Sequence, residues 1–281
     1  KTPKENLRFM VFLVNILKAL NEHADLVRAV IASPGNDHRL GANEAPPAIM
    51  SAFIGTQLTA MLDTLMVSDS LVAVSTGNSN VLLDKLPKIP EILIDNTDRN
   101  RTSPFTFTGN KFEFRAVGSS QTCALPMIVL NLIVADQLRK FRAEVDELVA
   151  RKVDVNDALF RTIRSYAAAS KNIRFEGNNY SGEWVNEAAI RGLSNLRSTP
   201  EALRAMVSDT TIALFRSNGI LSHRELHARH EIHLENYIKK IQIESRVLGD
   251  LAGNHIIPVA IRYQNLLIDN VKGLKEVLDM H

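Results

Sequence analysis

Three charged side chains alternate with two phenylalanines in the segment GNKFEFR, and this pattern is typical of one strand face. Lys111, Glu113 and Arg115 fall on the same side because successive side chains of a strand point to opposite faces. A carboxylate between two cations stays ionised, since both neighbours favour its charged form. Such a face could hold a divalent metal through the carboxylate and an anionic group through the cations. A solvated strand face is the alternative, and it is favoured when this segment is taken alone.

Two polar segments that precede this strand add to the pattern. The Gly- and Pro-rich segment SPGNDHRLGANEAPPAI predicts a loop that carries Arg39 and Glu44. A loop of this kind can close over a ligand and bring a guanidinium and a carboxylate into one site. The segment NRTSP adds Arg101. A plain surface loop and an exposed turn are the alternatives for these two segments.

The remaining candidate residues carry weaker signals. His223, His227 and His230 share one helical stripe, and histidine pairs at this spacing can bind zinc, but the HExxH arrangement is absent and an exposed polar helix is favoured. Cys123 is expected to be a buried, inert thiol. The sequence has no P-loop, Rossmann or GxSxG motif.

Composition narrows the classes of partner. The 281 residues are 45% hydrophobic and 23% charged, as in ordinary globular proteins. With 33 basic and 31 acidic residues the net charge is +2, which gives no argument for nucleic acid or an anionic membrane. No apolar run is long enough for a membrane span. A single cysteine excludes an internal disulfide and suits a reducing cytoplasm.

Helices and one hairpin are the elements expected to position these residues. FTFTGNKFEFR predicts two short strands about Thr108-Gly109-Asn110. Ser222 and Glu225 form a capping box pattern, and Gly219 suits a helix end. Apolar residues at intervals of three and four predict helices over 5–31, 49–65, 126–151, 154–170, 183–197, 199–217, 222–248 and 254–278.

The segments RLGANEAPP, NRTSP and KFEFR follow one another in the order seen in the C-terminal half of glutamine synthetase catalytic domains. The longer stretches GNDHRLGANEAPPAIMS, IPEILIDNTDRNRTSPFTFTGNKFEFRAVGSS and LGDLAGNHIIPVAIRYQN resemble type III glutamine synthetase in particular. The resemblance implies an α+β fold. Residues 1–140 would be the C-terminal part of the catalytic domain, with short antiparallel strands, and residues 141–281 a mostly helical C-terminal region.

The same resemblance implies an activity and its partners. Glutamate and ATP would give γ-glutamyl phosphate, and ammonia would then displace phosphate to form glutamine. Mg²⁺ or Mn²⁺ would be the metal. The enzyme would be cytoplasmic and would self-associate into stacked rings, as a dodecamer.

The resemblance also implies a catalytic or binding role for each residue that matches a family motif. Arg39 would bind glutamate. Glu44 would be the flap carboxylate that closes the glutamate entrance and helps to take a proton from ammonium. Arg101 would stabilise the phosphate during its transfer.

The strand residues receive the remaining roles. Lys111 stands near the nucleotide phosphates where the family pattern has arginine, and lysine lacks the planar fork that binds two oxygens. Glu113 would ligate the metal that activates the γ-phosphate, and Arg115 would contact glutamate or γ-glutamyl phosphate. Thr106 stands where the common pattern has a second phosphate-binding arginine.

The family's N-terminal β-grasp domain, its paired metal-binding glutamates and its Asn-Gly-Ser-Gly-x-His segment have no counterpart in this sequence. The chain is therefore expected to be a fragment of a longer enzyme and to be inactive by itself. Two alternatives stay open. The helical part could be an assembly or regulatory module without its own activity. The enzyme could also be a related ligase, such as a γ-glutamylamide synthetase that uses a larger amine or a guanido kinase-like relative.

Overall fold

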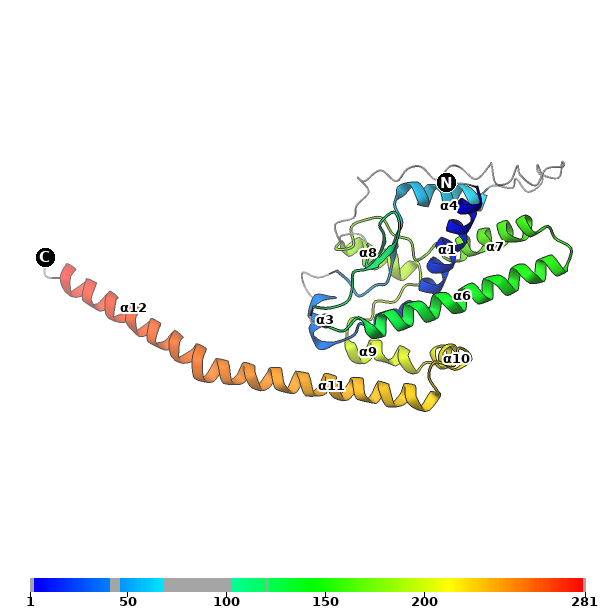
Figure 1. Ribbon diagram of the computed structural model, residues 1–281. Helices are drawn as coiled ribbons and strands as arrows, with labels where there is room; N and C mark the ends of the chain where they lie inside the picture. The colour runs from blue at the N-terminus through cyan, green and yellow to red at the C-terminus, as the bar shows by residue number, and fades with distance from the viewer. Residues whose placement is uncertain (1–2, 41–45, 68–102, 120, 280–281) are drawn as a thin grey trace. The chain divides into compact units, whose positions relative to one another are not determined.

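The computed structural model describes residues 3–40, 46–67, 103–119 and 121–279. The chain divides into two compact units, Lys1–Glu231 and Ile232–His281, and each is described by itself. Figure 1 traces their helices and strands. The extended segment expected at IPEILIDN lies outside the described residues.

Three long helices of the first unit, α1, α6 and α7, pack against one another (Figure 1). Leu13, Leu17 and Leu20 of α1 are at most 1% exposed, as the spacing of three and four predicts. The helices of this unit are α1 Pro3–Glu22, α2 Ala24–Ala29, α3 Pro34–Arg39, α4 Thr56–Val67, α6 Ala124–Ala150, α7 Val155–Ala169, α8 Gly182–Ile190, α9 Thr199–Leu203, the 3₁₀-helix η3 Arg204–Val207 and α10 Asp209–Ser217.

A small sheet lies beside these helices, with strands β1 (Ala52–Phe53), β2 (Phe105–Phe107) and β3 (Phe112–Phe114) in that order. β1 runs parallel to β2, and β2 runs antiparallel to β3. Gly109 adopts φ 97° in the connecting turn, a conformation that favours glycine. The predicted hairpin and the α+β class are confirmed.

The helical part of the first unit is hydrogen-bonded directly to this sheet. The amide of Ala52 donates to the carbonyl of Ile173 at 2.8 Å, and the amide of Phe175 donates to the carbonyl of Ala52 at 2.9 Å. The amide of Ala48 donates to Oδ1 of Asn195 at 3.0 Å. Residues on both sides of position 140 therefore build one unit. The predicted domain division falls inside α6, and it stays a prediction.

Three expectations for the N-terminal part differ from the structure. The helix predicted over 5–31 is interrupted at His23, which lets α2 pack against α9 and η3. Part of the predicted loop is helix α3, because Ser33 caps it by accepting from the amide of Asn36 at 3.2 Å and Pro34 occupies its first turn. The helix predicted over 49–65 starts at Thr56, because β1 pairs with β2.

Two helices in the C-terminal half also differ from expectation. The helix predicted over 199–217 breaks at Ser208, whose hydroxyl accepts from the amide of Thr211 at 3.3 Å and starts α10. The helix predicted over 183–197 ends at Ile190, just before Gly192 at φ 78°. Cys123 is exposed, so the expectation of a buried thiol is wrong.

Helix α11, His223–Asp250, begins with the predicted capping box. The amide of Ser222 donates to Oε2 of Glu225 at 2.8 Å, and the amide of Glu225 donates to the Ser222 hydroxyl at 3.3 Å. Gly219 has φ 64° just after α10, as expected for a helix end.

The second unit contains the end of α11, the π-helix η4 (Leu251–Ile256) and α12 (Ile257–Leu278). Among its described residues, no side chain of α12 is buried. A search of the described helices of both units finds none with the length and apolarity that crossing a membrane requires.

Asp136 on α6 predicts a pH-dependent stability. Burial raises the pKa of its carboxyl group, but hydrogen bonds from Asn218 and Lys140 lower it more, so the pKa lies below its usual 3.8. A depressed pKa in the folded state stabilises at pH values above the unfolded pKa, and this contribution is lost as pH falls through the folded pKa. We expect Asp136→Asn to lower the free energy of unfolding by about 1 kcal/mol near neutral pH.

Urea denaturation near neutral pH and in steps below 3.8 checks this expectation, with the exposed Asp146→Asn on the same helix as the control. The difference between Asp136→Asn and the unchanged chain should shrink as the pH falls. A difference that stays constant with pH would show that the charge of Asp136 contributes nothing.

Candidate substrate site

The charged face of β3 forms as the alternation predicts. Oε1 of Glu113 lies 3.3 Å from Nζ of Lys111, and its Oε2 accepts from Nε and Nη2 of Arg115 at 3.1 and 3.0 Å. These hydrogen bonds, first that of Arg115 and then that of Lys111, lower the pKa of the Glu113 carboxyl group. Glu113 is therefore an ionised, solvent-accessible carboxylate between two cations at neutral pH.

The opposite side of the hairpin holds the strand in place. The rings of Phe105 and Phe112 stack with centroids 4.9 Å apart, and Phe105 also meets Phe114 at 6.1 Å. Aromatic pairs across neighbouring strands stabilise a hairpin. The phenylalanines thereby fix the direction in which the charged face points.

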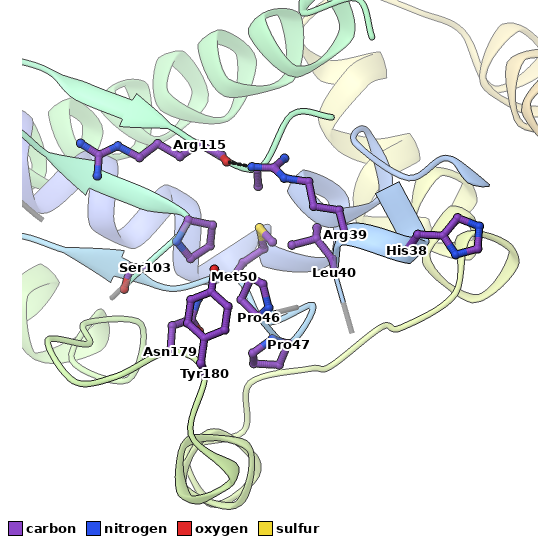
Figure 2. Close-up of a pocket in the computed structure, with 12 residues that line it drawn as sticks. His38, Arg39, Leu40, Pro46, Pro47, Met50, Ser103, Arg115, Asn179 and Tyr180 are labelled. Carbon is purple, nitrogen blue, oxygen red and sulfur yellow. Dashed lines mark hydrogen bonds between the residues drawn. The ribbon is translucent and has the colours of Figure 1, made fainter. Parts of the chain in front are cut away.

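Side chains of helix α3 donate hydrogen bonds to three consecutive backbone carbonyl groups that directly follow β3. The guanidinium of Arg39 donates to the carbonyls of Arg115 and Val117 at 2.6 and 2.8 Å, and Figure 2 draws its bond to Arg115. Between them, Nδ2 of Asn36 donates to the carbonyl of Ala116 at 3.0 Å. These bonds bring the guanidinium of Arg39 beside the backbone of Arg115, whose own side chain extends away from it and binds Glu113 (Figure 2).

A buried arginine holds α3 itself. Arg28 on α2 is 1% exposed, and its Nε donates to the carbonyl of Leu196 at 2.9 Å. Its Nη2 lies 3.2 Å from Oδ1 of Asp37 on α3, which also accepts from the hydroxyl of Thr199 at 2.8 Å. Burial lowers the pKa of Arg28, and the charge of Asp37 opposes that shift. The sequence reasoning missed this residue, although a lone arginine within the apolar run LVRAVI was a visible signal.

A cavity of about 310 Å³ lies beside the end of α3, the residues before β2 and the residues after β3 (Figure 2). This volume is at the lower end of the range for small-molecule sites. Guanidinium groups pair with carboxylates and phosphates, and apolar walls suit a short carbon chain. The cavity can therefore accept a small anionic molecule. Among its lining residues are Arg39, Met50, Ser103, Pro104, Arg115 and Tyr180.

The loop before α8 forms one wall of this cavity, and the sequence reasoning had assigned it no role. The amide of Tyr180 donates to Oδ1 of Asn178 at 3.1 Å, and the hydroxyl of Ser181 accepts from the amide of Trp184 at 3.2 Å. Phe175 stacks on Trp184, with ring centroids 3.6 Å apart. The segment NNYSGEW contains the residue types of an Asx turn and a helix cap, so both features are predictable from the sequence. Their position beside the cavity is not predictable in this way.

Gly177 in this loop allows a test of its packing. A Cβ atom at this position would lie 2.7 Å from Cζ of Phe175, a buried ring that is stacked on Trp184 and cannot move aside freely. We expect Gly177→Ala to lower the free energy of unfolding by about 1–3 kcal/mol. Gly182→Ala, in the first turn of α8, is the matched control, because a Cβ atom added there would have no neighbour within 4 Å. Equal urea midpoints for the two variants would contradict the packing described.

The other expected site residues fall into two groups: those outside the described residues and those that do not line the cavity. Glu44 and Arg101 lie outside the described residues. Glu113 on β3 and Lys111, which directly precedes this strand, do not line the cavity. Thr106 is buried in β2 and donates to the carbonyl of Ser103 at 3.0 Å, so it supplies no charge where the family pattern has arginine.

The histidine stripe on α11 shows no metal site. The rings of His223 and His227 lie 4.4 Å apart, but the described parts of the chain contain no group of three or more His, Cys, Asp or Glu that could hold a metal ion. Glu225, Glu231 and Glu235 are exposed, as an exposed polar helix requires.

Fold and site together define an α+β unit with a small cavity whose lining includes Arg39 and Arg115. The family model described as the glutamine synthetase C-terminal domain matches residues 158–275. The chain belongs to the glutamine synthetase family.

Relatives extend this similarity over nearly the whole chain. A Bacteroides fragilis protein named glutamine synthetase is 50% identical over 277 residues, which are 99% of this chain. The type-3 glutamine synthetase of Dictyostelium discoideum is 44% identical over 97% of it, and a Butyrivibrio fibrisolvens glutamine synthetase is 37% identical over 99%. The chain spans 38%, 37% and 39% of the lengths of these three relatives. The resemblance to type III glutamine synthetase is thereby confirmed.

Proposed function

We propose that this chain is part of an ATP-dependent ligase that joins ammonia to the γ-carboxylate of L-glutamate and so serves nitrogen assimilation. The observation that carries the proposal is the placement of Arg39 beside Arg115 at the cavity, with Glu113 bound to Arg115 on the adjoining strand. In this arrangement one arginine connects a site for an anionic amino acid with an ionised carboxylate.

Arg39 and Arg115 bind glutamate in this proposal. Two guanidinium groups match a substrate that carries two carboxylates. Arg39 is held on two backbone carbonyls, so little of its side-chain freedom remains to be lost when glutamate binds. Arg115 reaches from the cavity to Glu113, so it also stands close to where the phosphate is transferred.

Glu113 holds a divalent metal in this proposal, and Lys111 lies near the nucleotide phosphates. An ionised, exposed carboxylate is a ligand that Mg²⁺ and Mn²⁺ prefer, so Glu113 fits as one member of a metal site. The metal, when bound, offsets negative charge on the phosphates of ATP. The other ligands would come from parts of the protein beyond this chain, which spans 38% of its Bacteroides relative.

The proposed reaction has two steps. The γ-carboxylate of glutamate attacks the γ-phosphate of ATP, ADP leaves, and γ-glutamyl phosphate forms. Ammonia, after loss of a proton from ammonium, attacks the acyl carbon and displaces phosphate. Glu44 helps to take that proton, and Arg101 stabilises the transferred phosphate. Positioning and electrostatics supply most of the rate in such transfers.

We further propose that the complete protein assembles into stacked rings, works in the cytoplasm, and needs parts that this chain lacks. The isolated chain should then release no phosphate from ATP. Glutamine formation by the purified chain, after a contaminating enzyme has been excluded, would contradict this proposal.

The test uses the complete protein that contains this chain. Phosphate release from ATP should require both glutamate and ammonium, and glutamine should appear in equal amount. Methylamine and ethanolamine, supplied in place of ammonium, test the alternative of a larger amine. A preference for either amine would replace glutamine synthetase with a γ-glutamylamide ligase.

An assembly role for the helical end is the second candidate function. Apolar side chains on α12 such as Ile261, Leu266 and Leu274 are at least 50% exposed, and exposed apolar surface of this kind marks interaction sites. Light scattering should show a smaller particle for the complete protein with Leu266→Glu and Leu274→Glu. Lys272→Glu, at an exposed polar position on the same helix, is the control. An unchanged particle would remove this candidate.

A further inference from the structure

The loop before α8 places two residues at the cavity that the family resemblance did not assign. Asn179 and Tyr180 both line it, and Figure 2 shows them together, apart from Arg39 and Arg115. Asn179 is only 3% exposed, yet its Oδ1 is buried without a hydrogen-bond partner among the described residues. Buried amide groups are nearly always paired, so this one indicates a partner that a bound molecule would supply.

Tyr180 contributes a different surface. Tyr180 is 49% exposed, so part of it stays open to a molecule in the cavity. Met50 and Pro104 also line the cavity, so the tyrosine ring extends an apolar surface. A short run of methylene groups is the part of an amino acid that such a surface suits.

The loop is fixed firmly enough to act as a wall. The hydroxyl of Ser103 donates to the carbonyl of Phe175 at 3.1 Å, and the same hydroxyl accepts from Ser51 at 2.9 Å. Phe175 in turn stacks on Trp184, at the start of α8. The wall therefore connects to α8 and to the residues that precede β1 and β2, and contacts that it makes with a ligand need little ordering of the chain.

We propose that Asn179 and Tyr180 are substrate-contacting residues that select the amino acid by its side-chain length. The Tyr180 ring packs on the two methylene groups of a dicarboxylic amino acid whose charged ends pair with Arg39 and Arg115. The Asn179 amide accepts a hydrogen bond from the substrate's ammonium group. This inference rests on the proposed function, and it gives the helical C-terminal region a part in substrate recognition.

The test measures KM for glutamate and for ATP with the complete protein. Tyr180→Ala should raise KM for glutamate about tenfold and leave KM for ATP unchanged, because two methylene contacts are lost. Tyr180→Phe keeps the ring and should stay within about threefold of the unchanged protein. Asn179→Leu keeps a similar side-chain volume but has no oxygen to accept a hydrogen bond from the substrate's ammonium group, so KM for glutamate should rise about tenfold.

Activity toward aspartate, which is one methylene shorter, gives a second readout. Tyr180→Ala should reduce the preference for glutamate over aspartate, which a purely structural role would not change. Glu183→Gln, on the exposed first turn of α8, is the control and should change neither constant.

The outcomes separate this inference from the proposed function. An active protein whose Tyr180→Ala and Asn179→Leu variants keep the original KM for glutamate would overturn the inference alone. Equal increases in both KM values would also overturn it, since they would indicate general damage. A complete protein that does not use glutamate would overturn the proposed function and the inference together.

Discussion

Glu113→Gln in the complete protein should lower the rate of glutamate- and ammonium-dependent phosphate release by at least about 100-fold. The amide has the shape of the carboxylate but lacks the charge that a divalent metal requires. The substitution also removes the ionic partner of Lys111 and Arg115, which lie 3.3 and 3.0 Å from the carboxylate. Steady-state assays at saturating substrate, repeated across Mg²⁺ concentrations, measure the loss.

Glu147→Gln provides the matched control for this variant. Glu147 also pairs with an arginine, Arg151, and its side chain is 63% exposed on α6. The control should keep full activity, because exposed ion pairs contribute little to stability. If Glu113→Gln matched Glu147→Gln in rate, the metal-binding role of Glu113 would be wrong.

Arg28→Met should lower the free energy of unfolding by about 3 kcal/mol or more. Methionine fills much of the same volume but donates no hydrogen bonds. The carbonyl of Leu196 and the carboxylate of Asp37 would then lose their partner at an almost fully buried position. Since Asp37 belongs to α3, the variant should also loosen the helix that carries Arg39.

Urea denaturation of the variant and the unchanged chain measures this loss. Arg142→Met is the control, because Arg142 is 84% exposed in a surface pair with Asp146 and should change stability by less than about 0.5 kcal/mol. Equal midpoints for Arg28→Met and Arg142→Met would show that the buried bonds of Arg28 do not hold α3.

Local pattern was sufficient to predict the hairpin and the long helices. Phe112 and Phe114 alternate with charged residues, and Gly109 permits the turn, so strand, register and charged face all follow from neighbouring residues. The spacing of apolar residues in the long helices is equally local. The capping pattern from Ser222 to Glu225 located the start of α11 for the same reason.

Two of the misses, β1 and Arg28, share a physical cause, which is contact between residues far apart in the chain. β1 is only two residues long, and it forms because Ala52 pairs with Phe105 and bonds to Ile173. Helix α3 is a miss of another kind: its glycine and proline content suggests a loop, but the local cap from Ser33 to Asn36 forms a helix. No local pattern could show that Arg28 reaches Leu196.

In the candidate site, too, the residues in local motifs were predictable and those placed by long-range contacts were not. Arg39, Lys111, Glu113 and Arg115 were found from an ordered set of motifs, and the structure joins Arg39 to Arg115 through backbone carbonyls. The wall formed by Asn179 and Tyr180 was missed. The position of this wall depends on the backbone hydrogen bond from Phe175 to Ala52, which cannot be predicted from the sequence of the loop.

Transfer of an oxygen atom from glutamate to phosphate tests the central claim most directly. The complete protein would be given ATP, ammonium and glutamate labelled with ¹⁸O in its γ-carboxylate, and the phosphate released would be analysed by mass spectrometry. If γ-glutamyl phosphate forms, the phosphate that ammonia displaces carries one oxygen from the glutamate carboxylate. Unlabelled phosphate would show that water attacks ATP directly, and it would contradict the ligase reaction proposed for Arg39, Glu113 and Arg115.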